Sequence, residues 1–241
     1  MDAQRPLGEA IGDWSAPPAP GPSAMEGRYA RLERLDAGAH AEALHAANAA
    51  DDRIWDYLPY GPFRTPEAYA AWVQQMARSQ DPFFYAIRDL DSGAWGGVAS
   101  YLRIAPEVGS IELGHINLAP QLQGTRAATE ALTLMIRWAM DAGYRRFEWK
   151  CDALNAGSRR AAERLGLSYE GVFRQATIVK GRNRDTAWFA ATDGDWPALR
   201  AAYDRWLEPA NFDPRGRQIE SLFTLTAPLL VAQDPARRPR G

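Results

Sequence analysis

The segment from Ile111 to Glu130 (IELGHINLAPQLQGTRAATE) combines residue types that suit the binding of a carbonyl group or an anion. Its first half has the alternation of a strand, but the apolar face changes parity midway, from Ile111 and Leu113 to Ile116 and Leu118. A one-residue β-bulge at Gly114-His115 reconciles the two patterns and turns neighbouring backbone amides toward the same side. We therefore expect a bulged strand that presents N–H groups to a ligand.

The loop after this strand has the features of an anion-binding helix start. Pro120 to Thr125 is a tight loop that leads into a helix, with Gly124 at the entry. Free N–H groups at a helix N-terminus, together with the helix dipole, favour a bound anion by about 0.3 to 1 kcal/mol per charge at exposed positions. The junction fits a phosphorylated ligand, and it fits equally well a strand that turns into a helix for packing reasons alone.

The same residues carry a family resemblance. The run Gln121 to Ala127 (QLQGTRA) resembles the Gln/Arg-x-x-Gly-x-Gly/Ala motif with which GNAT (general N-acetyltransferase) proteins bind the pyrophosphate of acetyl-CoA. The next residues, Ala128 to Ala131 (ATEA), are similar to the Ala-Thr-Glu-Ala that opens this helix in RimJ/RimL-like members. Asn155 to Gly171 resembles that branch's Asn-x-x-Ser segment, which ends in Gly-Phe-x-x-Glu-Gly; here Leu167 replaces the Phe. The resemblance extends from about Tyr29 to Trp196.

The resemblance implies a set of acetyl-CoA contacts. In GNAT proteins the amides of the bulged strand polarise the acyl carbonyl, which assigns that role to the backbone around Ile116, Asn117 and Leu118. Asn155 matches an asparagine that contacts the pantetheine arm, and capping of the following helix is a compatible role. Ser158 matches a serine proposed to protonate the thiolate, with a local hydrogen bond in the first helical turn as the alternative. The phosphate loop comprises Gln123, Gly124, Thr125, Arg126, Ala127 and Ala128.

Arg126 departs from the family motif, which has a glycine at this position. The bulk of the side chain should crowd a loop wrapped around pyrophosphate, whereas its guanidinium could contact a phosphate directly, and a side chain in solvent is the third option. Arginine supplies nearly all the positive charge of the chain, since Lys150 and Lys180 are the only lysines. Codon preference explains this bias better than function does.

Acyl transfer from a thioester to an amine needs a neutral amine, a stabilised oxyanion and a proton for the departing thiolate. An alkylamine with a pKa near about 10.4 is mostly protonated at neutral pH, so a base assists. Glu112 on the bulged strand is the candidate base, and His115 is an alternative that more often serves in packing. Glu130 belongs to helix structure more than to catalysis. Many family members use no dedicated base.

The acceptor side of the cleft falls, by resemblance, on the segment Ile54 to Phe63 (IWDYLPYGPF). Aromatic rings beside a carboxylate suit an amine-bearing acceptor, and a hydrophobic lid packed on the sheet is an equally weighted reading. The candidate acceptor-binding residues are Trp55, Asp56, Tyr57 and Tyr60. Arg159 and Arg160 could meet the cofactor phosphates, but solvated helix residues are the more common case.

The elements that position these residues follow from periodicity and turn residues. Thr65 and Pro66 predict an N-cap and first residue of a helix that runs to about Ser79. Strands are expected at 28–36, 83–88, 95–104, 110–118, 147–151, 168–175 and 186–191. The other helices are expected at 39–50, 126–142, 155–165 and 196–207. This order predicts an α/β (α+β) protein of GNAT fold, with a mixed, mostly antiparallel sheet of about seven strands flanked by helices.

Composition bounds the remaining possibilities. The 241 residues carry a net charge of -2, which gives no general attraction for nucleic acid or an anionic membrane. The single cysteine, Cys151, and three histidines exclude an internal disulfide and a Cys/His zinc cage, so no metal is expected. No apolar run is long enough for a membrane span or a signal peptide, which favours the cytoplasm. We expect a proline-rich arm at 1–27, one acyltransferase domain at 28–195 and a helical extension with a tail at 196–241.

The sequence thus predicts an N-acyltransferase that moves an acetyl group from acetyl-CoA to a primary amine through a ternary complex. The acceptor is a small molecule or a peptide or protein N-terminus, and the oligomeric state, a homodimer included, stays open. Succinyl-CoA or another acyl-CoA is an alternative donor, and a non-catalytic CoA-binding protein of the same fold is the alternative from another class. A serine hydrolase is disfavoured because no Gly-x-Ser-x-Gly elbow occurs.

Overall fold

The computed structural model describes residues 5–236 and contains one eight-stranded sheet in the order β1-β2-β3-β4-β5-β6-β8-β7. Neighbouring strands are antiparallel except β5 and β6, which are parallel. The strands are β1 (Ala24–Glu26), β2 (Ala30–Arg34), β3 (Phe83–Asp89), β4 (Trp95–Ala105), β5 (Ser110–Leu118), β6 (Arg146–Asp152), β7 (Ser168–Val179) and β8 (Arg182–Thr192). The α-helices are α1 (Ala37–Asn48), α2 (Pro66–Arg78), α3 (Arg126–Asp141), α4 (Ala156–Arg164), α5 (Trp196–Leu207) and α6 (Leu222–Thr226).

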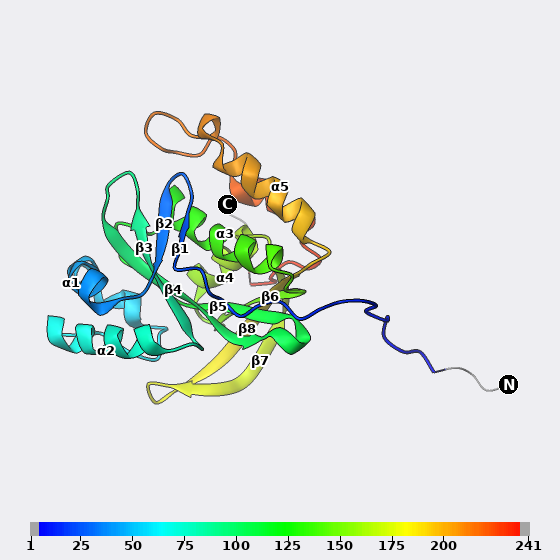
Figure 1. Ribbon diagram of the computed structural model, residues 1–241, viewed down its shortest axis with the longest axis horizontal. Coiled ribbons are helices and arrows are strands. Elements are labelled where there is room, and N and C mark those ends of the chain that lie inside the picture. The colour runs from blue at the N-terminus through cyan, green and yellow to red at the C-terminus, as the bar shows by residue number, and fades with distance from the viewer. Residues whose placement is uncertain (1–4, 237–241) are drawn as a thin grey trace.

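Helices cover the two faces of the sheet unequally. On one face α1 and α2 pack over β3 and β4, around a smaller core that includes Trp55, Tyr69 and Phe84. On the other face α3 packs on β2, β3, β5 and β6, around a larger core that includes Met135 and Phe147, and α5 lies against α3. Figure 1 shows α1 and α2 at one side of the sheet and the β7–β8 hairpin projecting from the other end. The first face is therefore left without a helix over β6, β8 and β7.

The helix boundaries follow the capping residues of the sequence. Thr65 is the N-cap of α2, and its side chain accepts a hydrogen bond from the N–H of Ala68, as its position before Pro66 predicts. Thr125 caps α3 in the same way and accepts from the N–H of Ala128. The predicted apolar stripe of α3 is buried along its length, in Ala128, Ala131, Leu132, Met135 and Ala139.

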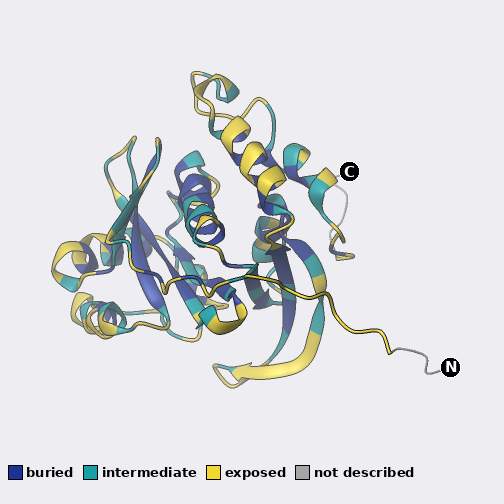
Figure 2. Ribbon diagram, turned by 45° about the vertical axis from the view of Figure 1, so that its right-hand side comes forward, coloured by how far each residue is buried: buried dark blue, intermediate teal, exposed yellow. Residues whose placement is uncertain are grey.

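The sheet has one strand more than the pattern of the sequence predicts. The additional strand, β1, pairs with β2 and lies within 1–27, the segment expected as an arm. Three residues are too few to give a detectable alternation, and this strand is defined by its partner rather than by its own sequence. The arm before it runs along the body without regular structure, and Figure 2 shows its exposed outer part extending away from the fold.

Glu130 of α3 fixes the start of β2. Its buried carboxylate accepts hydrogen bonds from three consecutive backbone N–H groups, those of Arg28 (2.9 Å), Tyr29 (2.6 Å) and Ala30 (2.7 Å). Gly27 lies so close to this carboxylate that a Cβ atom there would be 2.3 Å from its carbon. Glu130 was expected to serve the structure of its own helix, whereas these contacts tie α3 to the start of β2.

Candidate active site

The bulge expected in the central strand is present in β5. Val98 of β4 pairs with Asn117 and Ser100 pairs with Gly114, so β5 has one more residue than β4 between these two pairs. His115 takes the additional position with a φ of 49°. The parity change in the sequence therefore corresponds to a real shift in register.

A gap opens beside the bulge because β5 and β6 separate. Their parallel register ends at Leu113 and Trp149, although β5 continues to Leu118 and β6 to Asp152. The edge of β5 that faces this gap has no strand partner along Ile116 to Leu118 within residues 5–236. Backbone N–H groups without a strand partner are available to a ligand that enters the gap.

A cleft of about 730 Å³ surrounds the gap. Its walls come from five strands, β4 to β8, and from the segment around the 3₁₀ helix Asp52–Trp55. It reaches from Gln123 in the loop before α3 to Phe173 and Ile178 on the projecting hairpin. The sequence-predicted residues that line it are Glu112, Ile116, Gln123, Asn155, Ser158 and Tyr57.

Glu112 lies in the cleft with two basic partners. Its Oε2 is 2.7 Å from Nη1 of Arg103 and 2.9 Å from Nζ of Lys150, and only 3% of its side chain is exposed. Burial raises the pKa of the Glu112 carboxyl above its ordinary value, and Arg103 and Lys150 oppose that rise. Both ion pairs use Oε2. We therefore consider Oε1 as the oxygen that accepts a proton.

His115 lines the same cleft as Glu112 and is held by an aromatic neighbour. Its Nδ1 is 3.1 Å from the hydroxyl of Tyr60, and the two rings stack at 5.6 Å between centroids. Burial, together with the charges of Arg103 and Arg184, lowers the pKa of His115 to about 4, against a smaller opposing effect of Asp81. At neutral pH this imidazole is uncharged, and it is a weaker base than an ordinary histidine.

Asn155 and Ser158 lie together at the start of α4. The Asn155 side chain caps the helix by accepting from the N–H of Ser158 at 3.0 Å. The indole Nε1 of Trp149 donates to the Ser158 hydroxyl oxygen at 3.0 Å. This bond occupies an acceptor site of the hydroxyl and leaves its hydrogen for another group. Cys151 is the neighbouring thiol, and burial raises its pKa to about 11, against a smaller lowering by the hydrogen bond with Ser158.

The loop before α3 has the open backbone that a phosphate needs. Gly124 has a φ of 72°, and no atom lies within 4 Å of the place where a Cβ would stand. The cap on Thr125 uses the N–H of Ala128, so the N–H groups of Arg126 and Ala127 have no partner within the helix. The Gln123 amide donates to the carbonyl of Leu118 at 2.9 Å and ties the loop to the end of β5.

Arg126 turns away from the cleft. Its guanidinium contacts Asp91 at 2.8 Å and lies 4.3 Å from the ring centre of Tyr29. A phosphate contact by this side chain would require it to leave both partners. The position occupied by glycine in the family motif therefore carries an arginine that packs outward, against β2 and the turn after β3.

The four expected acceptor residues divide into core and cleft. Trp55 is buried in the smaller core, with its ring near those of Tyr60 and Phe63, which matches the lid alternative. Tyr57 lines the cleft, and its hydroxyl donates to the carbonyl of Leu154. Asp56 is exposed and does not line the cleft. Tyr60 does not line the cleft, but its hydroxyl contacts Nδ1 of His115, which does.

Arg159 is engaged elsewhere, and Arg160 is exposed on α4. The Arg159 guanidinium makes a two-pronged ion pair with the buried carboxylate of Asp234 and donates to the carbonyl of Ala153. Neither arginine lines the cleft. A contact between Arg159 and a cofactor phosphate would break this pair.

Sequence reasoning missed the basic and indole groups of the cleft. Arg103, Lys150, Arg184 and Trp188 line it beside Glu112. The signal for one of them was present, since Lys150 is one of two lysines and shares a strand face with Glu148. The others come from strands whose alignment with β5 is set by pairing, which spacing along the chain does not reveal.

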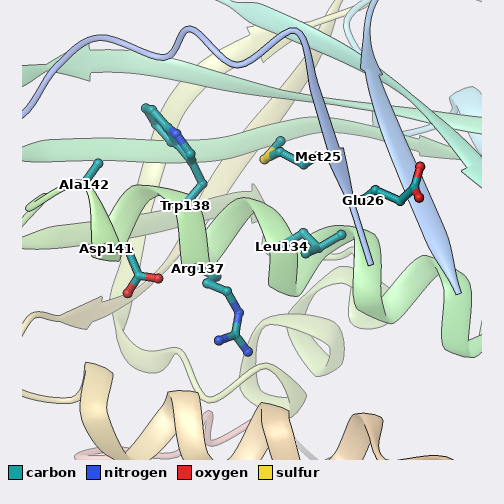
Figure 3. Close-up of a pocket in the computed structure, with 7 residues that line it drawn as sticks. All are labelled: Met25, Glu26, Leu134, Arg137, Trp138, Asp141 and Ala142. Atoms are coloured by element: carbon teal, nitrogen blue, oxygen red, sulfur yellow. The ribbon is translucent and has the colours of Figure 1, made fainter. Parts of the chain in front are cut away.

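A second cavity, of about 460 Å³, lies between β1 and the outer face of α3 (Figure 3). Its charged groups already have partners: Arg137 contacts Asp204 at 2.5 Å, and Asp141 accepts from the indole of Trp196 at 2.8 Å. Across residues 5–236 there is no group of acidic, histidine and cysteine side chains arranged to hold a metal. None of the helices in that range is long and apolar enough to cross a bilayer.

Comparisons with known proteins agree with this geometry. The sequence model of the acetyltransferase (GNAT) domain matches residues 31–168. A GCN5-related N-acetyltransferase from Brucella melitensis is 42% identical, with a TM-score of 0.88 over 90% of this chain and 100% of that one. A probable GNAT acetyltransferase from Chromobacterium violaceum is 40% identical, with a TM-score of 0.76 over 80% and 98%. RimL, a ribosomal L7/L12 alpha-N-protein acetyltransferase, shares the fold at 24% identity, with a TM-score of 0.59 over 69% and 91%. The search of curated proteins gave no match.

The chain belongs to the GNAT acetyltransferase family. Its enzyme class is N-acetyltransferase, and its eight-stranded mixed sheet is the fold of that family.

Proposed function

We propose that the protein transfers an acetyl group from acetyl-CoA to a primary amine that is bound beside it in the same cleft. The observation that carries this proposal is the gap between β5 and β6, whose cleft is lined both by Gln123 of the loop before α3 and by the buried Glu112. A thioester cofactor supplies an activated acyl group, and the amine supplies the nucleophile. Binding both at once removes the need for a covalent enzyme intermediate.

The residues at the gap fit acetyl-CoA in two places. The open space above Gly124 and the N–H groups of Arg126 and Ala127 suit the pyrophosphate. The unpartnered edge of β5 between Ile116 and Leu118 suits the pantetheine and the acyl carbonyl, which the N–H groups on that edge polarise. The N–H of Asn117 has the parity of Ala119, which donates to Gly96, and therefore faces β4. Asn155 and Ser158 face the same cleft from α4. We keep succinyl-CoA as the alternative donor.

Glu112 and Ser158 are assigned the proton transfers. Burial raises the pKa of Glu112, which makes its carboxylate a better base, and Oε1 takes the amine proton while Oε2 stays with Arg103 and Lys150. Ser158 passes its hydroxyl proton to the leaving thiolate and regains a proton from solvent water, while the Trp149 indole N–H donates to the serine oxygen. The ion pairs hold Glu112 in place during both steps.

The test compares Glu112→Gln with Glu148→Gln. Both carboxylates contact Lys150, but Glu148 does not line the cleft. We expect Glu112→Gln to lower kcat for thiol release from acetyl-CoA by about 10²-fold, the usual size of a general-base contribution, with the affinity for acetyl-CoA unchanged. Glu148→Gln should keep kcat within about threefold. Equal activity of the two variants would remove Glu112 as the base.

Measurements on the wild-type protein distinguish an acetyltransferase from a non-catalytic CoA-binding protein. Calorimetric titration with acetyl-CoA, succinyl-CoA and CoA identifies the ligand, and thiol release over a panel of amines identifies turnover. Binding of acetyl-CoA without thiol release from any amine would favour the CoA-binding alternative. No binding of any CoA species at millimolar concentration would overturn the proposal.

We also propose membership of the RimJ/RimL-like branch, an acceptor that is a small molecule or a peptide N-terminus, and a cytoplasmic location. The Ala128 to Ala131 run and the Asn155 to Gly171 segment support the branch. The single buried cysteine suits a reducing compartment.

A further inference from the structure

Two unpaired hydrogen-bond donors lie in the cleft on strand β8. The Nε of Arg184 and the Nε1 of Trp188 are buried, and neither has a hydrogen-bond partner within residues 5–236. Both residues line the cleft with Glu112 and Lys150. Leaving a buried donor without a partner is costly, so two of them in one cleft point to a group that the bound ligand supplies.

Arg184 also brings a positive charge that the protein does not balance. Lys150, a nearby cation whose side chain is 8% exposed, has two carboxylates, Glu112 at 2.9 Å and Glu148 at 2.7 Å. Arg184 has no carboxylate within 4 Å among the residues that the structure describes. Its neighbour Asp185 instead accepts hydrogen bonds from Gln175 and Asn183. The cleft therefore has one basic group in excess at this position.

The position of Arg184 in the sheet separates it from the expected phosphate loop. Along β8, Ala187, Phe189 and Ala191 belong to the core beneath α3, whereas Arg184 and Trp188 have the opposite parity. Glu112 and Lys150 lie on this same face, because their neighbours Leu113 and Trp149 point into the α3 core. The start of α3, where the cofactor phosphates are expected, is on the other face. An anion at Arg184 is thus on the side of the sheet where Glu112 meets the acceptor.

The floor around Arg184 suits a short polar ligand. The ring of Phe173 contacts Trp188 at 4.5 Å between centroids, with the ring planes tilted by 37°, and Nζ of Lys150 lies 3.9 Å from the centre of the same indole. These contacts fix the indole, so its N–H has a defined direction. The Thr186 hydroxyl lies on the same strand face and lines the same cleft.

We infer that the acceptor amine carries an anionic group, a carboxylate or a phosphate monoester, which Arg184 and Trp188 bind while the amine lies at Glu112. This inference rests on the proposed function, since it defines the acceptor of the same site. The guanidinium forms a charge-assisted hydrogen bond with the anion, and the indole N–H adds a neutral one. A plain alkylamine would leave both donors unpaired and would bind more weakly.

The experiment measures thiol release from acetyl-CoA with matched amines. One arm uses glycine, β-alanine and γ-aminobutyrate against their carboxamides, and the other uses O-phosphoethanolamine against ethanolamine. We expect wild type to favour the charged member of at least one pair by tenfold or more in kcat/KM. Arg184→Gln should raise KM for that charged member about tenfold and leave its neutral partner unchanged.

Arg182→Gln is the matched control, because Arg182 is exposed on the same strand and does not line the cleft. It should behave as wild type. The inference is overturned if wild type does not distinguish the members of any pair, or if Arg184→Gln lowers kcat/KM equally for charged and neutral amines. A preference for the amino acids over their carboxamides indicates a carboxylate, and a preference for O-phosphoethanolamine over ethanolamine indicates a phosphate.

A binding measurement separates this inference from the proposed function. If no amine releases thiol, the acetyl-transfer proposal fails, and calorimetry with β-alanine and O-phosphoethanolamine on protein saturated with acetyl-CoA tests the anion site alone. Binding to wild type that is about tenfold weaker in Arg184→Gln supports the site. Equal binding to both proteins, or none to wild type, overturns it.

Discussion

At the residue scale, His115 combines an unusual backbone with an unusual charge state. Its φ of 49° lies in the left-handed region, which histidine, asparagine and aspartate enter more readily than other residues with a side chain. Its ring is buried between Tyr60 and Phe84. The bulge thus places a neutral imidazole in the cleft that the carboxylate of Glu112 also lines.

The lowered pKa of His115 predicts a loss of stability in mild acid. In the unfolded chain the imidazole takes up a proton below its ordinary pKa of 6.5, whereas the folded protein resists protonation down to about 4. Between these pH values the unfolded state binds more protons, so the free energy of unfolding falls by about 2 kcal/mol from pH 7 to pH 5 because of this group. Urea unfolding at the two pH values measures the loss.

His115→Asn is the informative variant for this prediction, since asparagine tolerates a positive φ and does not titrate. Its free energy of unfolding should change less between pH 7 and pH 5 than that of wild type. An unchanged difference would show that another group causes the acid sensitivity.

Spacing along the chain predicted which carboxylate enters the cleft but not which cations meet it. Glu112 was chosen because the bulged strand borders both substrates in the family that the sequence resembles, and the parity of Ile111 and Leu113 places it on the face opposite to theirs. Arg103 reaches the cleft from β4, whose pairing with β5 shifts after Leu102, and Arg184 reaches it from β8, which is aligned with β5 only through β6. Arg126 could not be placed, because its partner Asp91 is 35 residues earlier.

At the element scale, the bulge in β5 is the feature that the sequence predicted most directly. A single residue inserted into one strand reverses the parity of every later side chain, and this reversal is visible in the sequence. The position of β1 was not visible, because a three-residue strand has no period. The long β7–β8 hairpin was also underestimated, since its exposed outer part lacks the apolar face on which strand prediction depends.

Gly124 and Gly181 give a matched pair for testing the phosphate loop. They have φ values of 72° and 73°, and at both the space around a Cβ is open. Leucine at either position should therefore cost a similar 1–2 kcal/mol of backbone strain. We expect Gly124→Leu to weaken acetyl-CoA binding at least tenfold in calorimetry, because its side chain fills the space above the loop.

Gly181→Leu should bind acetyl-CoA as wild type does, because Gly181 lies in the turn of the β7–β8 hairpin. Equal affinities for the two variants would mean that the cofactor phosphates bind elsewhere.

At the scale of the whole molecule, both terminal segments pack on the body. The hydroxyl groups of Tyr85 and Tyr144 donate to carbonyls of Pro22 and Pro18, which fixes the inner half of the proline-rich arm. At the other end the backbone of Tyr169 donates to Ala232, so the tail lies along the start of β7. The division into arm, domain and extension stays a prediction, and these contacts show that the three parts touch.

The pair between Arg159 and Asp234 should be a strong anchor for the tail. The two side chains are 11% and 2% exposed, so Asp234→Asn leaves a nearly buried guanidinium without its counter-charge. We expect a loss of about 3 kcal/mol in the free energy of unfolding, measured in urea. The exposed pair between Arg137 and Asp204 is the control, and Asp204→Asn should cost less than about 1 kcal/mol.

The double variant Arg159→Met, Asp234→Leu should be more stable than Asp234→Asn, because it removes both buried charges. If Asp234→Asn and Asp204→Asn lose the same free energy, the tail contributes nothing beyond a surface contact.

The separation of β5 and β6 also has a mechanical consequence. Strands β1 to β5 and strands β6 to β8 are joined across the sheet by only four paired positions, whereas β6 and β8 share seven. Bending of the sheet should therefore concentrate between β5 and β6, while strands β1 to β5 and strands β6 to β8 each move as a more rigid unit. A molecule that occupies the gap contacts both units and resists the rotation of one against the other. Acetyl-CoA bound in the gap would contact both parts of the sheet and reduce their relative motion. The junction at which the amine must be aligned would then be more rigid in the complex than in the free protein.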